Sequence, residues 1–139
     1  MSVWSHVAAI VRIDGLRSLG EDEPNWNVIF GKECLFESPS EVWDDACKHP
    51  EKYLPMGSEG TLQKSVWVNP DRSYAAAYTV SIFGDLRDHK DVDGLINWFK
   101  DIVINKVWTR QASITIDNIL YSPGTVTWAY TGEEEVTDG

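Results

Sequence analysis

The chain has 139 residues, of which 42% are apolar and 24% are charged, as in an ordinary globular domain. Its 12 Lys and Arg residues stand against 22 Asp and Glu residues, so the formal net charge is -10. This surplus of acid argues against binding to nucleic acid and to an anionic membrane, because both depend on clustered cations. We therefore expect one domain over residues 1–132, followed by a flexible acidic tail over residues 133–139.

The amino-terminal residues and the two cysteines bear on the compartment. The start of the chain lacks the basic and apolar regions of a signal peptide, and no apolar run reaches the ~18 residues of a membrane-spanning helix. Cys34 and Cys47 do not have the spacing of a metal site. A bridge between them is one interpretation, but two free thiols and a cytoplasmic location are the expectation.

The first predicted strand is a nearly continuous apolar run over residues 7–14, which is typical of a central strand and ends at Gly15. Residues 15–37 are interpreted as an insertion, or lid. Within it, an exposed loop is expected to precede a short hairpin built from residues 26–30 and 33–36.

A helix is predicted to follow this insertion. Ser38 fits its N-cap, Pro39 its first position and Glu41 the reciprocal partner of a capping box. Pro50 ends the helix, because a proline disfavours helical backbone in the residue before it.

Alternation of apolar and polar residues over residues 62–69 and 74–83, with a turn cluster between them, predicts a β-hairpin. A second helix is predicted over residues 92–104, where apolar residues recur on one helical face. Asp91 stands in front of it as a candidate N-cap.

Two further strands are predicted at residues 111–117 and 125–131, so the order of elements is β, insertion, α, β, β, α, β, β. This order is the βαββαβ pattern of a ferredoxin-like α+β fold, an antiparallel sheet with two helices on one face. The insertion follows the first strand, and an extra strand ends the chain. The two most apolar strands, residues 7–13 and 74–83, would take the central places of that sheet.

The sheet face away from the helices is predicted to carry mainly small and hydroxyl side chains. A solvated face more often shows Lys, Glu and Arg, whereas small residues let a second surface approach closely. An ordinary solvent face is one interpretation; a homo-oligomer contact or a ligand pocket is the other, and a homo-oligomer is the expected assembly. The residues assigned to this face are Ala8, Ile10, Arg12, Ser65, Trp67, Ala77, Thr79, Ser81, Ser113, Thr115 and Thr127.

The densest polar cluster lies at residues 84–94 and includes Asp85, Asp88, His89 and Asp91. These side chains can ligate a metal, but no Glu stands where an EF-hand loop requires one. The end of a strand and the capping of a helix explain the same acids. We therefore expect no metal and no cofactor. No His or Cys belongs to a known nucleophile motif, so no catalytic residue is assigned and an enzyme is not expected.

Aromatic and cationic residues supply the candidate ligand contacts. Some of the seven Trp residues fit core positions, whereas others lie at element edges, in the insertion or on the open face, and an exposed indole can stack on a base. Arginine is suited to hold phosphate groups. The candidate ligand-binding residues are Arg12, Trp26, Trp67, Thr79, Ser81, Arg87 and Arg110.

Three segments carry a resemblance to known proteins: WSHV at residues 4–7, YLPMGSEGTL at residues 53–62 and AYTVSIFGDLRD at residues 77–88. Together they resemble small uncharacterised accessory proteins of bacteriophages and prophages. The resemblance brings no catalytic motif, but it implies a counter-defence context. Such proteins inhibit a host protein, mimic the charge of DNA or sequester nucleotide immune signals as oligomers.

The sequence therefore favours a non-enzymatic protein that sequesters a small nucleotide-like ligand in the cytoplasm of a host cell. The alternative is an acidic inhibitor or DNA mimic that acts on a host defence protein, which the net charge supports because an acidic surface attracts a basic partner. A small enzyme is the third hypothesis.

Overall fold

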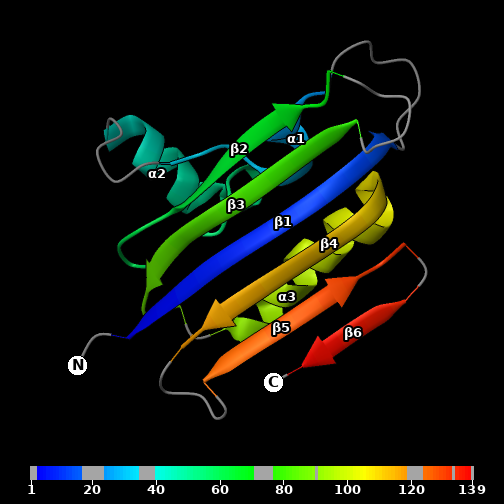
Figure 1. Ribbon diagram of the computed structural model, residues 1–139. Coiled ribbons are helices and arrows are strands. Elements are labelled where there is room, and N and C mark those ends of the chain that lie inside the picture. The colour runs from blue at the N-terminus through cyan, green and yellow to red at the C-terminus, as the bar shows by residue number, and fades with distance from the viewer. Residues whose placement is uncertain are drawn as a thin grey trace.

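A computed structural model describes residues 3–16, 24–34, 40–70, 77–89, 91–118, 124–132 and 134–138. In these residues the chain forms one six-stranded antiparallel sheet in the order β2-β3-β1-β4-β5-β6 (Figure 1). The strands are β1 Trp4–Leu16, β2 Leu62–Val68, β3 Tyr78–Arg87, β4 Val107–Asp117, β5 Thr125–Tyr130 and β6 Glu135–Asp138. The fold class is therefore α+β, as predicted.

The helices of the described residues lie at different places relative to the sheet. Helix α3 lies along the far face of the sheet in Figure 1, whereas α2 lies beyond the β2 side of the sheet. The helical elements are α1 Trp26–Phe30, α2 Ser40–Lys48, the 3-10 turn η1 Pro50–Lys52, α3 Val92–Asp101 and the π-helical turn η2 Ile102–Lys106.

The prediction that the first strand is central is confirmed. Strand β1 pairs with β3 on one side and β4 on the other, both antiparallel. Its side chains alternate: Val7, Val11 and Ile13 are buried beneath the sheet, whereas Ala8 and Ile10 are exposed on the open face. This alternation decides which face of the whole sheet holds the core, because cross-strand partners share a face.

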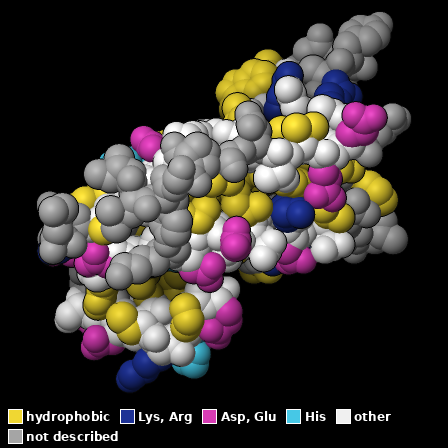
Figure 2. Space-filling view, turned by 90° about the horizontal axis from the view of Figure 1, so that it is seen from below, with side chains coloured by type: hydrophobic (Ala, Val, Ile, Leu, Met, Phe, Trp, Pro, Cys, Tyr) yellow, Lys and Arg dark blue, Asp and Glu magenta, His cyan; other side chains and the backbone are white. Residues whose placement is uncertain are grey.

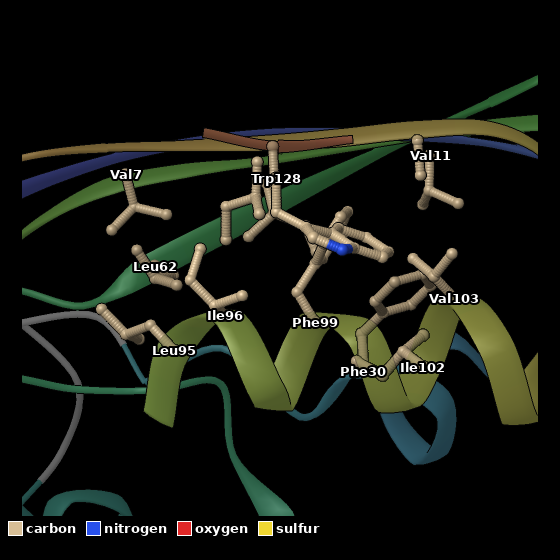
Figure 3. Packing of buried hydrophobic residues seen from close by; sticks show 14 of the residues in the cluster. Val7, Val11, Phe30, Leu62, Leu95, Ile96, Phe99, Ile102, Val103 and Trp128 are labelled. Atoms are coloured by element: carbon tan, nitrogen blue, oxygen red, sulfur yellow. The ribbon is translucent and has the colours of Figure 1, made fainter. Parts of the chain in front are cut away.

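The core lies between the sheet and α3, as Figure 3 shows. Leu95, Ile96 and Phe99 form the apolar stripe predicted from their spacing, and all three are buried. Phe99 meets the fully buried ring of Trp128 from β5 edge-on, with ring centroids 5.9 Å apart. Such a pair buries a large apolar area and adds roughly 0.5–1.5 kcal/mol through its geometry.

The predicted hairpin at residues 26–30 and 33–36 is wrong in its first arm, which forms helix α1. The apolar run there looked like a strand, but Asn25 caps the backbone N–H of Val28 and starts a helical turn. Burial of Phe30 against the core then fixes the turn. Residues 35–36 lie outside the described residues.

The first predicted long helix is present as α2, although its expected caps Ser38 and Pro39 lie outside the described residues. Its buried residue, Ala46, belongs to a small separate cluster with Cys34 and Tyr53. Within the described residues, the buried side of the helix therefore packs against Cys34 and Tyr53, and Ala46 does not belong to the core cluster beneath the sheet. Two helices were expected on one face of the sheet; α3 lies there, but α2 does not. A ferredoxin-like topology is therefore not evident.

Tyr53 ties this small cluster together. Its hydroxyl donates a hydrogen bond of 2.6 Å to the carboxylate of Asp45 on α2. This bond lowers the pKa of Asp45 and raises the pKa of Tyr53 to about 12. Cys34 is buried, which raises the pKa of its thiol, and Cys47 is exposed; both are free thiols, as predicted.

Two strands differ from the prediction in where they begin or end. Strand β3 continues to Arg87 instead of ending at residue 83, and residues 74–76 of its predicted start lie outside the described residues. Strand β4 begins at Val107, four residues before the predicted start. The register with β1 shifts between Arg12 and Ile13, so apolar and polar residues do not alternate regularly in this part of β4. The alternation pattern therefore did not predict the first four residues of the strand.

The prediction of a flexible acidic tail is corrected over residues 135–138, which form β6 and pair with β5. Glu135 provides the physical reason. Its carboxylate accepts a hydrogen bond of 3.3 Å from the indole N–H of Trp128 and lies 3.2 Å from the ammonium of Lys100 on α3. These contacts lower the pKa of Glu135.

No helix of the described residues is both long and apolar enough to cross a membrane.

Replacing Glu135 by Gln should lower the melting temperature at neutral pH, because the ion pair with Lys100 is lost. The pKa of Glu135 in the folded chain lies below its ordinary value of 4.5, so its contribution is complete above that value and is lost as the pH falls through the depressed pKa. Circular dichroism melts of both proteins from about pH 7 to about pH 3 should show their difference closing at the acid end. A difference that stays constant would contradict the ion pair.

Replacing Gly31 by Ala should destabilise the fold by roughly 1–3 kcal/mol. Gly31 ends α1 with a φ of +112°, and a Cβ there would lie 2.6 Å from the backbone nitrogen of Leu54. Urea denaturation measures the change. Gly15→Ala is the matched control, because the nearest atom to its Cβ is 3.9 Å away on Trp108, and it should be nearly neutral.

Candidate functional site

A hollow of about 510 Å³ lies between α1 and the edge strand β2, which we call the α1–β2 pocket. Its volume is within the range of pockets that hold small molecules, roughly 300–1,000 Å³. It is lined by Pro24, Asn25, Trp26, Asn27, Glu33, Lys64 and Val66. Of the predicted ligand residues, Trp26 therefore lines this pocket.

The wall of the pocket is held by packing behind Trp26. Its ring contacts Tyr78 edge-on, with centroids 5.1 Å apart, and lies 6.1 Å from the ring of Phe30. The indole is half-buried, so one part of it belongs to the core and another part lines the hollow. A rigid aromatic wall of this kind costs little conformational entropy when a ligand stacks on it.

Lys64 joins the two sides of the pocket. From β2 its ammonium donates to the side-chain oxygen of Asn27 at 2.6 Å and to the carbonyl of Gly31 at 2.9 Å. An ammonium has three N–H groups, so one remains for a ligand. Partial burial lowers the pKa of Lys64, and the nearby Glu33 carboxylate opposes that shift.

Glu33 completes the polar lining. One carboxylate oxygen accepts a hydrogen bond of 3.2 Å from the backbone N–H of Lys64, which leaves the second oxygen available. Among the described residues, the side-chain amide N–H groups of Asn25 and Asn27 and the indole N–H of Trp26 have no hydrogen-bond acceptor. The pocket thus combines several donors, one carboxylate acceptor and an aromatic wall.

The open face of the sheet brings together most of the other predicted ligand residues. Thr79 pairs with Trp67 on one side and with Arg12 on the other, so these three form one row across the sheet. Ser81 lies in the next row, opposite Ile10.

At the edge of this group, Arg110 is held by an ion pair of 3.0 Å with Asp14. Arg12 forms no ion pair with any residue that the structure describes. The unpaired cation of the open face is therefore Arg12.

Arg87 does not join this group. It lies opposite Trp4 at the far end of β3, 2.7 Å from a carboxylate oxygen of Glu59 and 3.7 Å from one of Asp88. Trp26 lies in the pocket described above. Because it pairs with Trp4 and follows the buried Leu86, Arg87 lies at the far end of the open face. The seven predicted ligand residues thus fall in three places: the centre of the open face, the α1–β2 pocket and this ion-paired cluster at the far end of the open face.

The predicted composition of the open face is confirmed for its small and hydroxyl residues, but the face also carries exposed apolar side chains. Trp67, Phe83 and Ile10 are 52%, 51% and 44% exposed. Phe83 was not assigned to this face, although its alternation with Ser81 places it there. Contiguous exposed apolar patches are a general feature of interaction surfaces, whereas single exposed apolar residues are ordinary.

The acidic cluster at residues 84–94 serves the fold. Asp91 accepts a hydrogen bond of 2.8 Å from the N–H of Gly94 and caps α3, as predicted. Asp85 bonds to His6 at 2.6 Å, and Asp88 accepts from the N–H of Val3 at 3.1 Å. In the part of the chain that the structure describes, no three His, Cys, Asp or Glu side chains gather as a metal site.

A second hollow, of about 250 Å³, lies between α3 and the η1 segment. His89 lines it, and the Nδ1 atom of this ring is buried without a hydrogen-bond partner among the described residues. The hollow is smaller than the usual ligand pocket. It therefore ranks behind the α1–β2 pocket as a binding site.

Four pocket residues were not predicted from the sequence: Lys64, Glu33, Asn25 and Asn27. Lys64 could have been recognised from the sequence, because it interrupts a strand in which apolar and polar residues otherwise alternate. Asn25 and Asn27 flank the Trp in a segment that was interpreted as a hairpin, and only its helical form brings them to β2.

Comparisons of the chain with protein-family models, with curated proteins and with solved structures each gave no match.

Measured at a protein concentration low enough to keep the chain monomeric, replacing Trp67 by Ala should change the free energy of unfolding by no more than about 0.5 kcal/mol, because about half of its side chain is exposed. Replacing Trp128 by Ala should cost roughly 3–5 kcal/mol, because that ring is fully buried. Urea denaturation of the two variants measures the contrast. Equal losses would show that the open face is covered in solution by part of the same chain.

Proposed function

We propose that the chain is a non-enzymatic binding protein that holds the base of a small nucleotide-like ligand in the α1–β2 pocket. The observation that carries this proposal is the hollow of about 510 Å³, which has an indole wall. On both of its sides it has hydrogen-bonding groups without a partner among the described residues. An indole stacks on any nucleobase, and amide and carboxylate side chains are the groups that recognise base edges.

The charge of the pocket narrows the ligand class. Glu33 and Lys64 are its two ionisable residues, so the lining is formally neutral. A free carboxylate oxygen repels phosphate but accepts from an exocyclic amino group. The pocket therefore suits an amino-bearing base, and the phosphates of a nucleotide would lie outside it, toward solvent.

The resemblance to phage accessory proteins supplies the biological role of this binding. We propose that the protein sequesters a nucleotide-like immune signal in the host cytoplasm, which requires binding and release but no chemistry. Two free thiols suit a reducing compartment of this kind.

The fold assignment belongs to the same proposal. The strands β2, β3, β1 and β4 follow one another across the sheet in the order and directions of a βαββαβ unit. We propose a modified ferredoxin-like fold in which α2 does not pack on the sheet and in which β5 and β6 are added beside β4.

An acidic inhibitor of a host protein is the second candidate, favoured by the net charge of -10. Figure 2 shows the acidic side chains scattered among hydrophobic and uncharged ones on the face in view. A DNA mimic needs a continuous acidic surface, and this face does not have one. The pocket therefore supports the ligand-binding function more strongly than the charge supports the inhibitor.

Native mass spectrometry of the freshly purified chain, followed by calorimetric titration with adenine, cytosine and guanine nucleosides, tests the proposal. At least one amino-bearing nucleoside should bind. Glu33→Gln should weaken that binding about tenfold or more, because the amino group of the base loses its charged acceptor. Glu134→Gln, an exposed residue outside the pocket, is the matched control and should bind like the native chain.

Two outcomes would contradict the binder. The first is the absence of both a retained ligand and any nucleoside binding. The second is turnover of an offered nucleotide, which would make the chain an enzyme. A stoichiometric host protein in the mass spectrum, without ligand binding, would favour the inhibitor.

A further inference from the structure

The register of the sheet arranges the centre of the open face in two rows, each of which crosses five strands. One row holds Ser65, Ser81, Ile10, Ser113 and Ala129. The neighbouring row holds Gln63, Phe83, Ala8, Thr115 and Thr127. The two rows are consecutive on each strand, because same-face residues lie two positions apart.

Each strand places one larger and one smaller side chain in these rows. On β1 the larger is Ile10 and the smaller Ala8; on β3 the larger is Phe83 and the smaller Ser81. The same contrast holds on the other strands, for Gln63 and Ser65, Thr115 and Ser113, and Thr127 and Ala129. A surface on which every large side chain has a small same-face neighbour along its strand can pack against its own copy.

We propose that two copies of this chain pair through their open faces, about a twofold axis that lies in the interface and runs across the strands. This operation exchanges the two rows. It sets Ile10 of one protomer over the partner's Ala8, and Phe83 over the partner's Ser81. Such a contact is isologous, and it stacks the two sheets in the aligned arrangement of a β-sandwich.

The charges at the ends of the strands are complementary under the same operation. Arg12, the unpaired cation, lies at one end of the face, and Asp85 and Asp117 flank His6 at the other. Asp117 accepts from the hydroxyl of Thr125 at 3.4 Å and has no cation partner among the described residues. The twofold axis brings Arg12 of each protomer to the acidic end of the other.

The size of the face suits a stable dimer. Six strands spaced about 4.8 Å apart and a length of about 20 Å give a flat footprint of roughly 500 Å². Two such footprints sum to roughly 1,000 Å², which is the lower limit for a specific protein interface, and the relief of the side chains adds accessible area to this flat figure. Exposed apolar side chains at the centre and charges at the rim are the anatomy of such a surface.

Sedimentation equilibrium of the full chain tests the proposal, which does not depend on the ligand pocket. The native chain should have twice its monomer mass of 15.7 kDa. Ile10→Arg should raise the dimer dissociation constant about tenfold or more, because it buries a charge at the centre of the contact. Val28→Arg is the matched control, because Val28 is 72% exposed on α1, away from the open face.

Charge reversal tests the orientation. Arg12→Glu and Asp117→Arg should each weaken the dimer, and the double variant should restore it, because the twofold axis places Arg12 over the partner's His6, one strand away from the partner's Asp117. Circular dichroism confirms that each variant is folded. A native chain that stays monomeric, a dimer that Ile10→Arg leaves intact, or a double variant weaker than either single one would overturn the proposal. A monomer that binds a separate basic protein through this face would do so as well.

Discussion

The pairing of β1 with β3 and β4 is the constraint on which the rest of the structure depends. Strand β1 is the longest strand of the described residues, and its partners come from distant parts of the chain. Because side chains alternate along it, one choice of register assigns every same-face row of the sheet. The core beneath and the open face above are therefore two consequences of one register, and a slip by one residue would exchange them.

The sequence predicted the features that repeat with a fixed period. The alternation in β1, β2 and β5 and the stripe of α3 are each set by burial on one side, which leaves a periodic trace. It did not predict α1 or β6, because one turn of helix and four strand residues are fixed by distant contacts. Phe30 in the core decides the first, and the meeting of Glu135 with Trp128 and Lys100 decides the second. Neither contact has a local signature.

The same distinction explains the candidate site. The open face follows from alternation, so its residues were predictable and the structure keeps most of them together. The α1–β2 pocket joins residues 24–33 to a strand some thirty positions later through the hydrogen bonds of Lys64. Only a side chain long enough to cross the gap makes that connection, and no spacing rule marks its partner. The open face and the α1–β2 pocket are thus two separate surfaces, and only the first leaves a periodic trace in the sequence.

Glu33 has a consequence for assembly beyond the pocket. Its carboxylate occupies the backbone N–H of Lys64, which belongs to the outer edge of β2. An exposed strand edge is a template on which a further chain can pair, and repeated pairing produces fibres. With this edge obstructed and the opposite edge formed by the four-residue β6, the sheet offers little on which to grow sideways. Among the described residues, the ends of the sheet are therefore poor templates for open-ended polymerisation.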